Sequence, residues 1–236
     1  MAKKGKLKKF QEEELDKRPI RFKLYQYLFL IVCEDENTEP TYFKHFKNKI
    51  PEKTIFLKPV GTGRDPKGVV EQAIIERAKL SMLAKKEVDI VWAVFDKDDA
   101  DENATKIKRF EDAFKNAKYN KIETAYSNEV FELWLLLHLT DVDANVALTR
   151  AKIYALLQEN IRSYEGYKTF EYEHGNVSIL QIIYEIGSQK DAIIRAERLL
   201  QLQEAKTPIE ANPSTKVHIL VTQLLEWITY FSYKPN

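Results

Sequence analysis

Several features that mark particular protein classes are scarce in this sequence. It has one cysteine, Cys33, in 236 residues, which excludes an internal disulfide framework and any zinc site built from cysteines. Seven glycines and eight prolines are too few for a collagen-like chain and argue against a loop-rich β-sandwich. The longest apolar run, Tyr27 to Cys33, is too short to cross a bilayer. We therefore expect a globular protein of the reducing cytoplasm, without a membrane span.

An excess of one charge is also lacking. The chain has 37 Lys and Arg against 36 Asp and Glu, a formal net charge of +1. Nucleic-acid binding would therefore have to come from local patches. Residues 1–24 form a polar arm in which five lysines precede Glu12–Glu14. We interpret this arm as a solvated tail; the alternative is a basic arm that contacts phosphates.

Apolar runs and helical periods alternate from residue 25 to about residue 140. Four apolar runs predict buried strands, at residues 27–33, 54–60, 88–95 and 122–126. Helical periods follow each of them, at residues 38–49, 69–86, 104–118 and 129–139. Thr38 or Asn37 is predicted to cap the first of these helices. This alternation predicts an α/β fold, a parallel sheet of about four strands flanked by helices.

The pattern becomes helical after about residue 141. Four further helices are predicted, at residues 145–160, 178–188, 190–204 and 214–230. They form either a separate appendage or a helical cover on the sheet. We therefore divide the chain into three parts: an arm (1–24), an α/β domain (25–140) and an α-helical C-terminal region (141–236).

Acidic residues stand where two of the predicted strands end. Glu34 follows the first strand, and Asp96 and Asp98 follow the third. Ligands of open α/β sheets bind at the carboxyl ends of the strands, and neighbouring strands lie about 4.8 Å apart. If the two strands are neighbours, Glu34 and Asp96 come within reach of one ion. Asp96 and Asp98 share a face if the chain stays extended.

Carboxylates gathered in this way repel one another and tend to take up protons, a penalty that a divalent cation removes. Oxygen ligands without a His–Cys set favour Mg²⁺ or Mn²⁺, which supports phosphoryl-transfer chemistry. The alternative is that these acids are loop residues and helix caps. We adopt that alternative for Asp99 and Asp101, and predict a metal site for Glu34, Asp96 and Asp98.

The helix after the fourth strand carries further candidates. Glu132 has apolar neighbours, so it is either a catalytic group (a general base or an outer metal ligand) or half of a buried polar pair. Ser127 and Asn128 are predicted to cap this helix. We interpret His138 as a hydrogen-bonded histidine at the helix end, with a proton donor as the alternative.

Three other segments have weaker signals. The turn Gly61–Gly68 lacks the Gly-Lys-Ser/Thr ending of a P-loop, but Arg64 and Lys67 are candidate contacts for a nucleic-acid backbone. Asn212 or Ser214 is predicted to cap the last helix, unless this segment lines the active site. An aromatic stretch either packs the helical region onto the sheet, which we favour, or stacks on bases; it comprises Tyr164, Tyr167, Phe170 and Tyr172.

Three motifs together resemble the RloB-like family. They are Ile31-Val-Cys-Glu34-Asp-Glu-Asn-Thr38-Glu39-Pro-Thr-Tyr42-Phe43, Val94-Phe95-Asp96-Lys97-Asp98 and Ala125-Tyr-Ser127-Asn128-Glu-Val-Phe131-Glu132-Leu-Trp134-Leu-Leu-Leu-His138. The resemblance extends into Asn212-Pro-Ser-Thr215-Lys-Val-His218. That family includes the AbiLii type of abortive-infection protein, and its core resembles the TOPRIM domain of topoisomerases, primases and OLD-family nucleases.

The resemblance implies a TOPRIM-like site. Its strand-end glutamate would be Glu34, its Asp-x-Asp pair Asp96 and Asp98, and a further acid, a weaker metal ligand, Glu39. Asp35 stands where TOPRIM proteins usually carry glycine.

The family's association with restriction and anti-phage loci, often beside an ATPase, implies a function. We expect a nuclease that depends on Mg²⁺ or Mn²⁺, cleaves DNA or RNA in phage defence and works with an ATPase partner. The alternative is a non-catalytic regulatory or adaptor subunit of an ATPase-containing defence complex.

Overall fold

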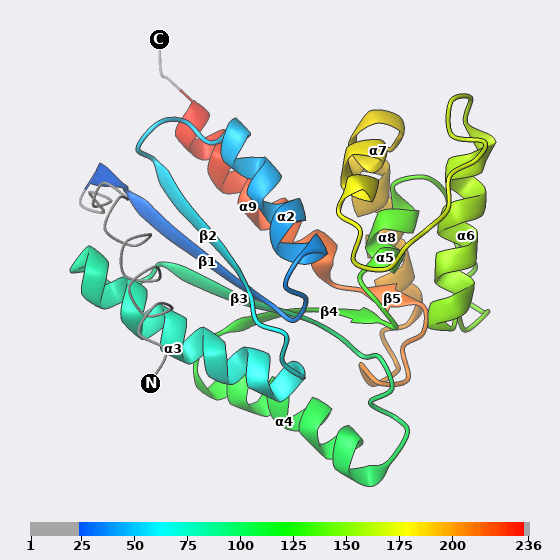
Figure 1. Ribbon diagram of the computed structural model, residues 1–236. Helices are drawn as coiled ribbons and strands as arrows, with labels where there is room; N and C mark the ends of the chain where they lie inside the picture. The colour runs from blue at the N-terminus through cyan, green and yellow to red at the C-terminus, as the bar shows by residue number, and fades with distance from the viewer. Residues whose placement is uncertain (1–23, 234–236) are drawn as a thin grey trace, which may run out of the picture.

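The strands form one mostly parallel sheet. The computed structural model describes residues 24–233 (Figure 1). Its sheet has the order β2-β1-β3-β4-β5. The strands are β1 (Tyr27–Cys33), β2 (Ile55–Gly61), β3 (Ile90–Asp96), β4 (Glu123–Asn128) and β5 (Ser214–Thr215). The first four are parallel and β5 is antiparallel to β4, which confirms the predicted α/β fold. β5 was not predicted, because a strand of two residues has no readable hydrophobic pattern.

Helices cover both faces of the sheet. They are α2 (Thr38–His45), α3 (Pro66–Ala84), α4 (Ala104–Tyr119), α5 (Glu132–Leu137), α6 (Arg150–Ser163), α7 (Ser178–Ile186), α8 (Gln189–Leu202) and α9 (Val217–Ser232), with a 3₁₀ turn η2 (Phe46–Lys49) after α2. In Figure 1, α3 and α4 lie along one face, α2 and α9 along the other, and α5–α8 gather beside the strand ends. The C-terminal region therefore covers the sheet with α9.

The continuous apolar run of β1 is explained by burial on both faces. Alternate residues belong to two different cores, Phe29 and Ile31 to one, and Leu28 and Leu30 to the other. All four side chains are fully buried. Strands sandwiched between helices need apolar side chains at every position, so the alternation typical of half-exposed strands is absent.

The predicted caps of two helices are wrong. Neither Asn37 nor Thr38 caps α2 with its side chain; within the described residues, the Asp35 carboxylate accepts a hydrogen bond from the Thr38 amide instead. Ser127 and Asn128 belong to β4, and α5 begins only at Glu132. Polar residues of these types suit strand ends and helix caps equally, so local pattern does not separate the two.

The segment before α9 also differs from the prediction. Ser214 pairs with Asn128 in the sheet, and α9 begins at Val217, so neither Asn212 nor Ser214 caps it. The Asn212 side chain instead binds both backbone groups of Leu148 and holds two distant loops together.

The N-terminal arm and a possible membrane span are the remaining points of the prediction. The predicted polar arm, residues 1–24, lies outside the described residues apart from its last position. No helix within residues 24–233 is long and apolar enough to cross a membrane.

Candidate functional site

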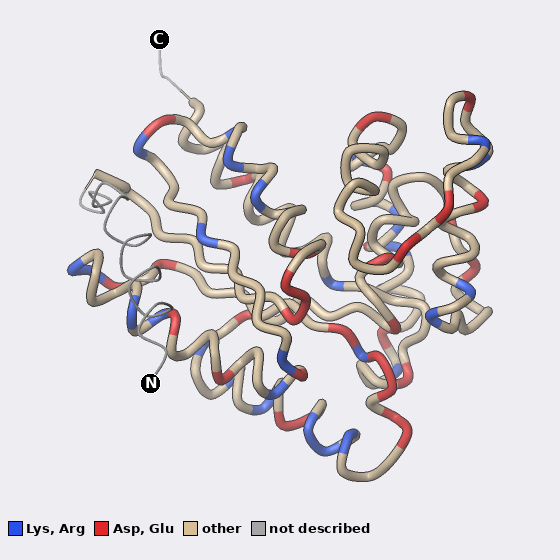
Figure 2. The backbone as a smooth tube through the Cα atoms, in the orientation of Figure 1, with Lys and Arg blue, Asp and Glu red and all other residues tan. Residues whose placement is uncertain are grey.

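β1 and β3 are adjacent parallel strands, so the condition on which a site shared by Glu34 and Asp96 depended is met. Cys33 is in register with Val94, and the Glu34 amide donates to the Val94 carbonyl at 2.9 Å. The Glu34 carboxylate then accepts the Asp96 amide at 3.0 Å. Figure 2 shows the acidic stretches after these two strands near the middle of the molecule. The fold therefore brings Glu34 and Asp96 to one point of the sheet edge.

The Asp96 carboxylate has a hydrogen-bond partner for only one of its two oxygens among the described residues. Its Oδ2 accepts the Phe131 amide at 3.0 Å, whereas its buried Oδ1 has no hydrogen-bond partner among the described residues. Burial raises the pKa of Asp96 well above its usual value, and the charges of Glu39 and Glu34 raise it further. A buried carboxylate oxygen without a partner is costly, so it requires a proton or a cation.

Two glutamates share this environment. Burial raises the pKa of Glu34 to about 8, although the Asp96 amide favours the charged form. Glu39 is 1% exposed, and burial followed by the charge of Glu34 raises its pKa well above the usual value. Its Oε2 accepts the Asp35 amide at 3.1 Å. Glu39 therefore stabilises the turn that presents Glu34, and its own charge adds to the repulsion.

Asp98 reaches the site differently from the prediction. The chain does not stay extended after β3, because Asp98 has a positive φ of 48° and its amide donates to the Glu129 carbonyl at 3.0 Å. Its carboxylate forms a hydrogen-bonded ion pair with Arg150, the first residue of α6. Burial raises the pKa of Asp98, and the charge of Arg150 opposes that effect.

A cavity of about 250 Å³ adjoins these acids. Glu34, Asp96 and Asp98 line it together with Pro66, Ala100 and Phe110. Its other lining residues are Asp65, Lys97, Asp99, Lys106 and Arg109. The three predicted metal ligands therefore face one space. The candidate phosphate contacts Arg64 and Lys67 do not line it.

Several charges at this cavity are paired. Asp99, which lines the cavity, pairs with Lys106, and Asp101 pairs with the buried Lys97. Arg109 pairs with Asp65, which also caps α3 by accepting the Gly68 amide. Sequence reasoning did not select Lys106 or Arg109, because charged residues on a helix surface are common.

The carboxylates converge without forming a finished metal centre. Among residues 24–233, no three His, Cys, Asp or Glu side chains are grouped so that they can hold one ion as they stand. Asp98 turns to Arg150, and Glu34 turns to the Asp96 amide. The donor set nevertheless suits a hard cation, since it consists of carboxylate oxygens and includes the unpartnered Oδ1 of Asp96.

Glu132 has partners that no sequence pattern indicated. The Tyr172 hydroxyl donates to its Oε1, and Nδ1 of His174 lies 3.7 Å from the same oxygen. Tyr154 contacts both partners, with its ring 4.6 Å from that of Tyr172 and its hydroxyl 3.2 Å from His174 Nδ1. Glu132 is therefore a hydrogen-bonded buried acid. In the aromatic stretch, Tyr167, Phe170 and Tyr172 pack against the larger core, as favoured.

His138 lies apart from the carboxylates. It is 4% exposed, and its Nδ1 lies 2.9 Å from the Trp134 carbonyl, so the expected hydrogen bond at the helix end is present. Burial lowers the pKa of His138 to about 4, which leaves the ring neutral at pH 7. It lines a different cavity of about 130 Å³, together with Tyr42 and Tyr184.

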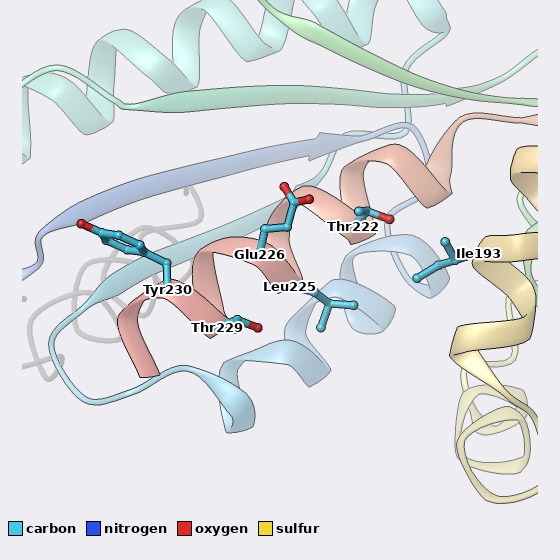
Figure 3. A pocket seen from close by; sticks show the side chains of 6 residues that line it. All are labelled: Ile193, Thr222, Leu225, Glu226, Thr229 and Tyr230. Atoms are coloured by element: carbon cyan, nitrogen blue, oxygen red, sulfur yellow. The ribbon is translucent and has the colours of Figure 1, made fainter. Parts of the chain in front are cut away.

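A larger cavity of about 530 Å³ lies between α8 and α9 (Figure 3). Its lining residues are Ile193, Thr222, Leu225, Glu226, Thr229 and Tyr230. They are mostly apolar or hydroxyl-bearing, with a single carboxylate. This composition does not provide a cluster of acids or bases for catalysis.

Comparison with known proteins places the chain in a family. The structure is that of an α/β protein whose sheet carries Glu34 and Asp96 at one edge, next to a helical C-terminal region. The chain matches the RloB-like protein family over residues 29–224 and belongs to that family. No curated protein and no solved structure matches it.

Proposed function

We propose that this protein is a metal-dependent nuclease that hydrolyses phosphodiester bonds in DNA or RNA. The observation that carries the proposal is the meeting of Glu34 and Asp96 at the carboxyl ends of two adjacent parallel strands. Both are half-buried residues with raised pKa values, and the buried Oδ1 of Asp96 has no partner among the described residues. Perturbed acids in a cleft are typical of functional sites.

Asp96, Asp98 and Glu34 would hold Mg²⁺ or Mn²⁺, with Glu39 as a weaker outer candidate. The cation supplies polarisation of the phosphate and a more acidic bound water. Glu34, with a pKa of about 8, is also suited to exchange a proton near neutral pH. Glu132 is bonded to Tyr172, which favours a role in holding the helical region against the site.

The strand order supports a TOPRIM-like core. A glutamate follows β1 and an Asp-x-Asp pair follows the adjacent β3, which is the arrangement that the resemblance implies. On this basis we infer an AbiLii-like role in cytoplasmic anti-phage defence, with an ATPase partner that supplies energy coupling.

The test is cleavage by the purified full-length protein. Labelled single- and double-stranded DNA and RNA are incubated with EDTA, Mg²⁺ or Mn²⁺. We expect cleavage with a divalent cation and none with EDTA, and loss of cleavage in D96N. As a matched control, E52Q removes a carboxylate whose side chain is 85% exposed and should cleave like the parent. Cleavage by D96N at the parent rate would refute the proposal, and an inactive parent would favour the adaptor role.

A further inference from the structure

The helical region places a cation directly on the carboxylate cluster. Arg150 begins α6, and its Nη2 donates to Oδ1 of Asp98. Burial by itself lowers the pKa of Arg150, but the nearby charges, that of Asp98 first, outweigh burial and raise this pKa. Arg150 and Asp98 are 52 positions apart in the sequence, so the contact joins the two parts of the chain across the site.

This ion pair remains open to a ligand. The Arg150 side chain is 45% exposed and that of Asp98 is 36% exposed. A guanidinium has five N–H donors in a planar fork, and the hydrogen bond to Asp98 engages one of them. Arginine in this setting matches two oxygens of a phosphate as well as it matches a carboxylate.

The two roles of Asp98 compete. The oxygen that accepts from Arg150 belongs to a carboxylate that also faces the cavity of Glu34 and Asp96. An Asp98 that turns to a cation in that cavity weakens its attraction for the guanidinium, because the carboxylate charge is then neutralised. The half-exposed guanidinium is then free to bind another anion, and a phosphate bound at the acids is one that the proposed reaction supplies.

We propose that Arg150 is a phosphate ligand of this site. It neutralises Asp98 in the free protein and transfers its hydrogen bonds to a phosphate of the nucleic-acid strand when Asp98 turns to the cavity. This inference rests on the proposed nuclease function and deepens it. It assigns the strand a path between the acidic sheet edge and the start of α6, so the helical region forms the second wall of the site.

The test measures binding rather than cleavage. Fluorescein-labelled 20-nucleotide single strands of DNA and RNA are titrated by fluorescence anisotropy, in Ca²⁺ and in EDTA, over a series of salt concentrations. The variants are R150Q and R150K. The matched control is R198Q, because Arg198 is a 69% exposed arginine of the same helical region that pairs with Asp141 at 3.7 Å.

We expect R150Q to weaken binding in Ca²⁺ by about tenfold, the loss of one charged hydrogen-bonded contact. The slope of log affinity against log salt should fall by about 0.7, the value for one phosphate contact on a single strand. R150K keeps the charge without the fork, so its slope should match the parent while its affinity falls severalfold. In EDTA the effect of R150Q should shrink, and R198Q should behave like the parent throughout.

Parent-like affinity and salt slope in R150Q would overturn the inference and leave Arg150 a counter-ion only. Failure of the parent to bind either strand would overturn it as well. If R150Q does not fold, R150K decides, and parent-like binding by that variant overturns it. A parent that binds through Arg150 but never cleaves refutes the nuclease and not the phosphate ligand. If cleavage depends on metal and is lost in D96N, but R150Q binds like the parent, the nuclease function stands and the phosphate-ligand role of Arg150 is refuted.

Discussion

Replacing Glu34 by glutamine removes an ionisable group that the fold holds in its neutral form. The pKa of Glu34 is about 8 in the folded protein against an ordinary value of 4.5, chiefly because of burial. Between these values the folded chain keeps a proton that the unfolded chain has lost. The free energy of unfolding of the metal-free parent must therefore fall as the pH rises through this window.

The size of the effect follows from the shift. Each pKa unit corresponds to about 1.4 kcal/mol, so the parent loses about 3 kcal/mol between pH 4.5 and 7 and about 4 kcal/mol between pH 4.5 and 8. Glutamine has no such dependence, and its side-chain oxygen still accepts the Asp96 amide. The free energy of unfolding of E34Q, relative to that of the parent, should therefore rise by these amounts over the same pH range.

The assay is urea unfolding in EDTA at pH 5, 6, 7 and 8, followed by tryptophan fluorescence. Trp134 is fully buried beside the site, which makes it a suitable reporter. The matched control is E52Q, whose curve should run parallel to that of the parent. Addition of Mg²⁺ should flatten the parent curve, because a bound cation favours the charged carboxylates, and should stabilise E34Q less.

Parallel curves for the parent and E34Q in EDTA would refute this reasoning. They would mean that Glu34 is charged in the folded protein and that its environment is more polar than the structure indicates.

Three other perturbations test the metal site, the buried histidine and the N-terminal arm. D96N keeps an oxygen for the Phe131 amide but removes one charge from the cluster. In EDTA its melting temperature should equal or exceed that of the parent. The stabilisation by Mg²⁺ should disappear, and cleavage should fall by about 100-fold or more. The buried imidazole of His138 has a pKa of about 4, so the parent should lose about 3 kcal/mol of its free energy of unfolding as the pH falls from 6.5 to 4. H138Q should not show this loss when both proteins are compared by urea unfolding. Deletion of residues 2–9 should weaken nucleic-acid affinity most at low salt, and unchanged affinity across a salt series would contradict the role of the arm.

The local sequence pattern was sufficient to predict the strands and helices and to select Glu34 and Asp96 as site residues. Buried strands appear as continuous apolar runs, so β1 and β3 were readable together with the order of strands and helices. Glu34 and Asp96 were selected because the residue after such a strand lies at the ligand-binding edge of the sheet. The ends of the helices were less readable, as Asn128 shows, since the same polar residue serves a strand end or a cap.

Tertiary structure alone decided the rest of the site. Arg150 reaches Asp98 across 52 positions and Tyr172 reaches Glu132 across 40, and no spacing in the sequence records either contact. The turn at Asp98 depends on a backbone hydrogen bond that its amide donates to the carbonyl of Glu129. The pKa values of the acids likewise follow from burial and from neighbouring charges, which exist only once the chain has folded. The chain order of residue types determines which groups stand at a strand end, whereas the partners of those groups depend on segments that packing brings together from far apart.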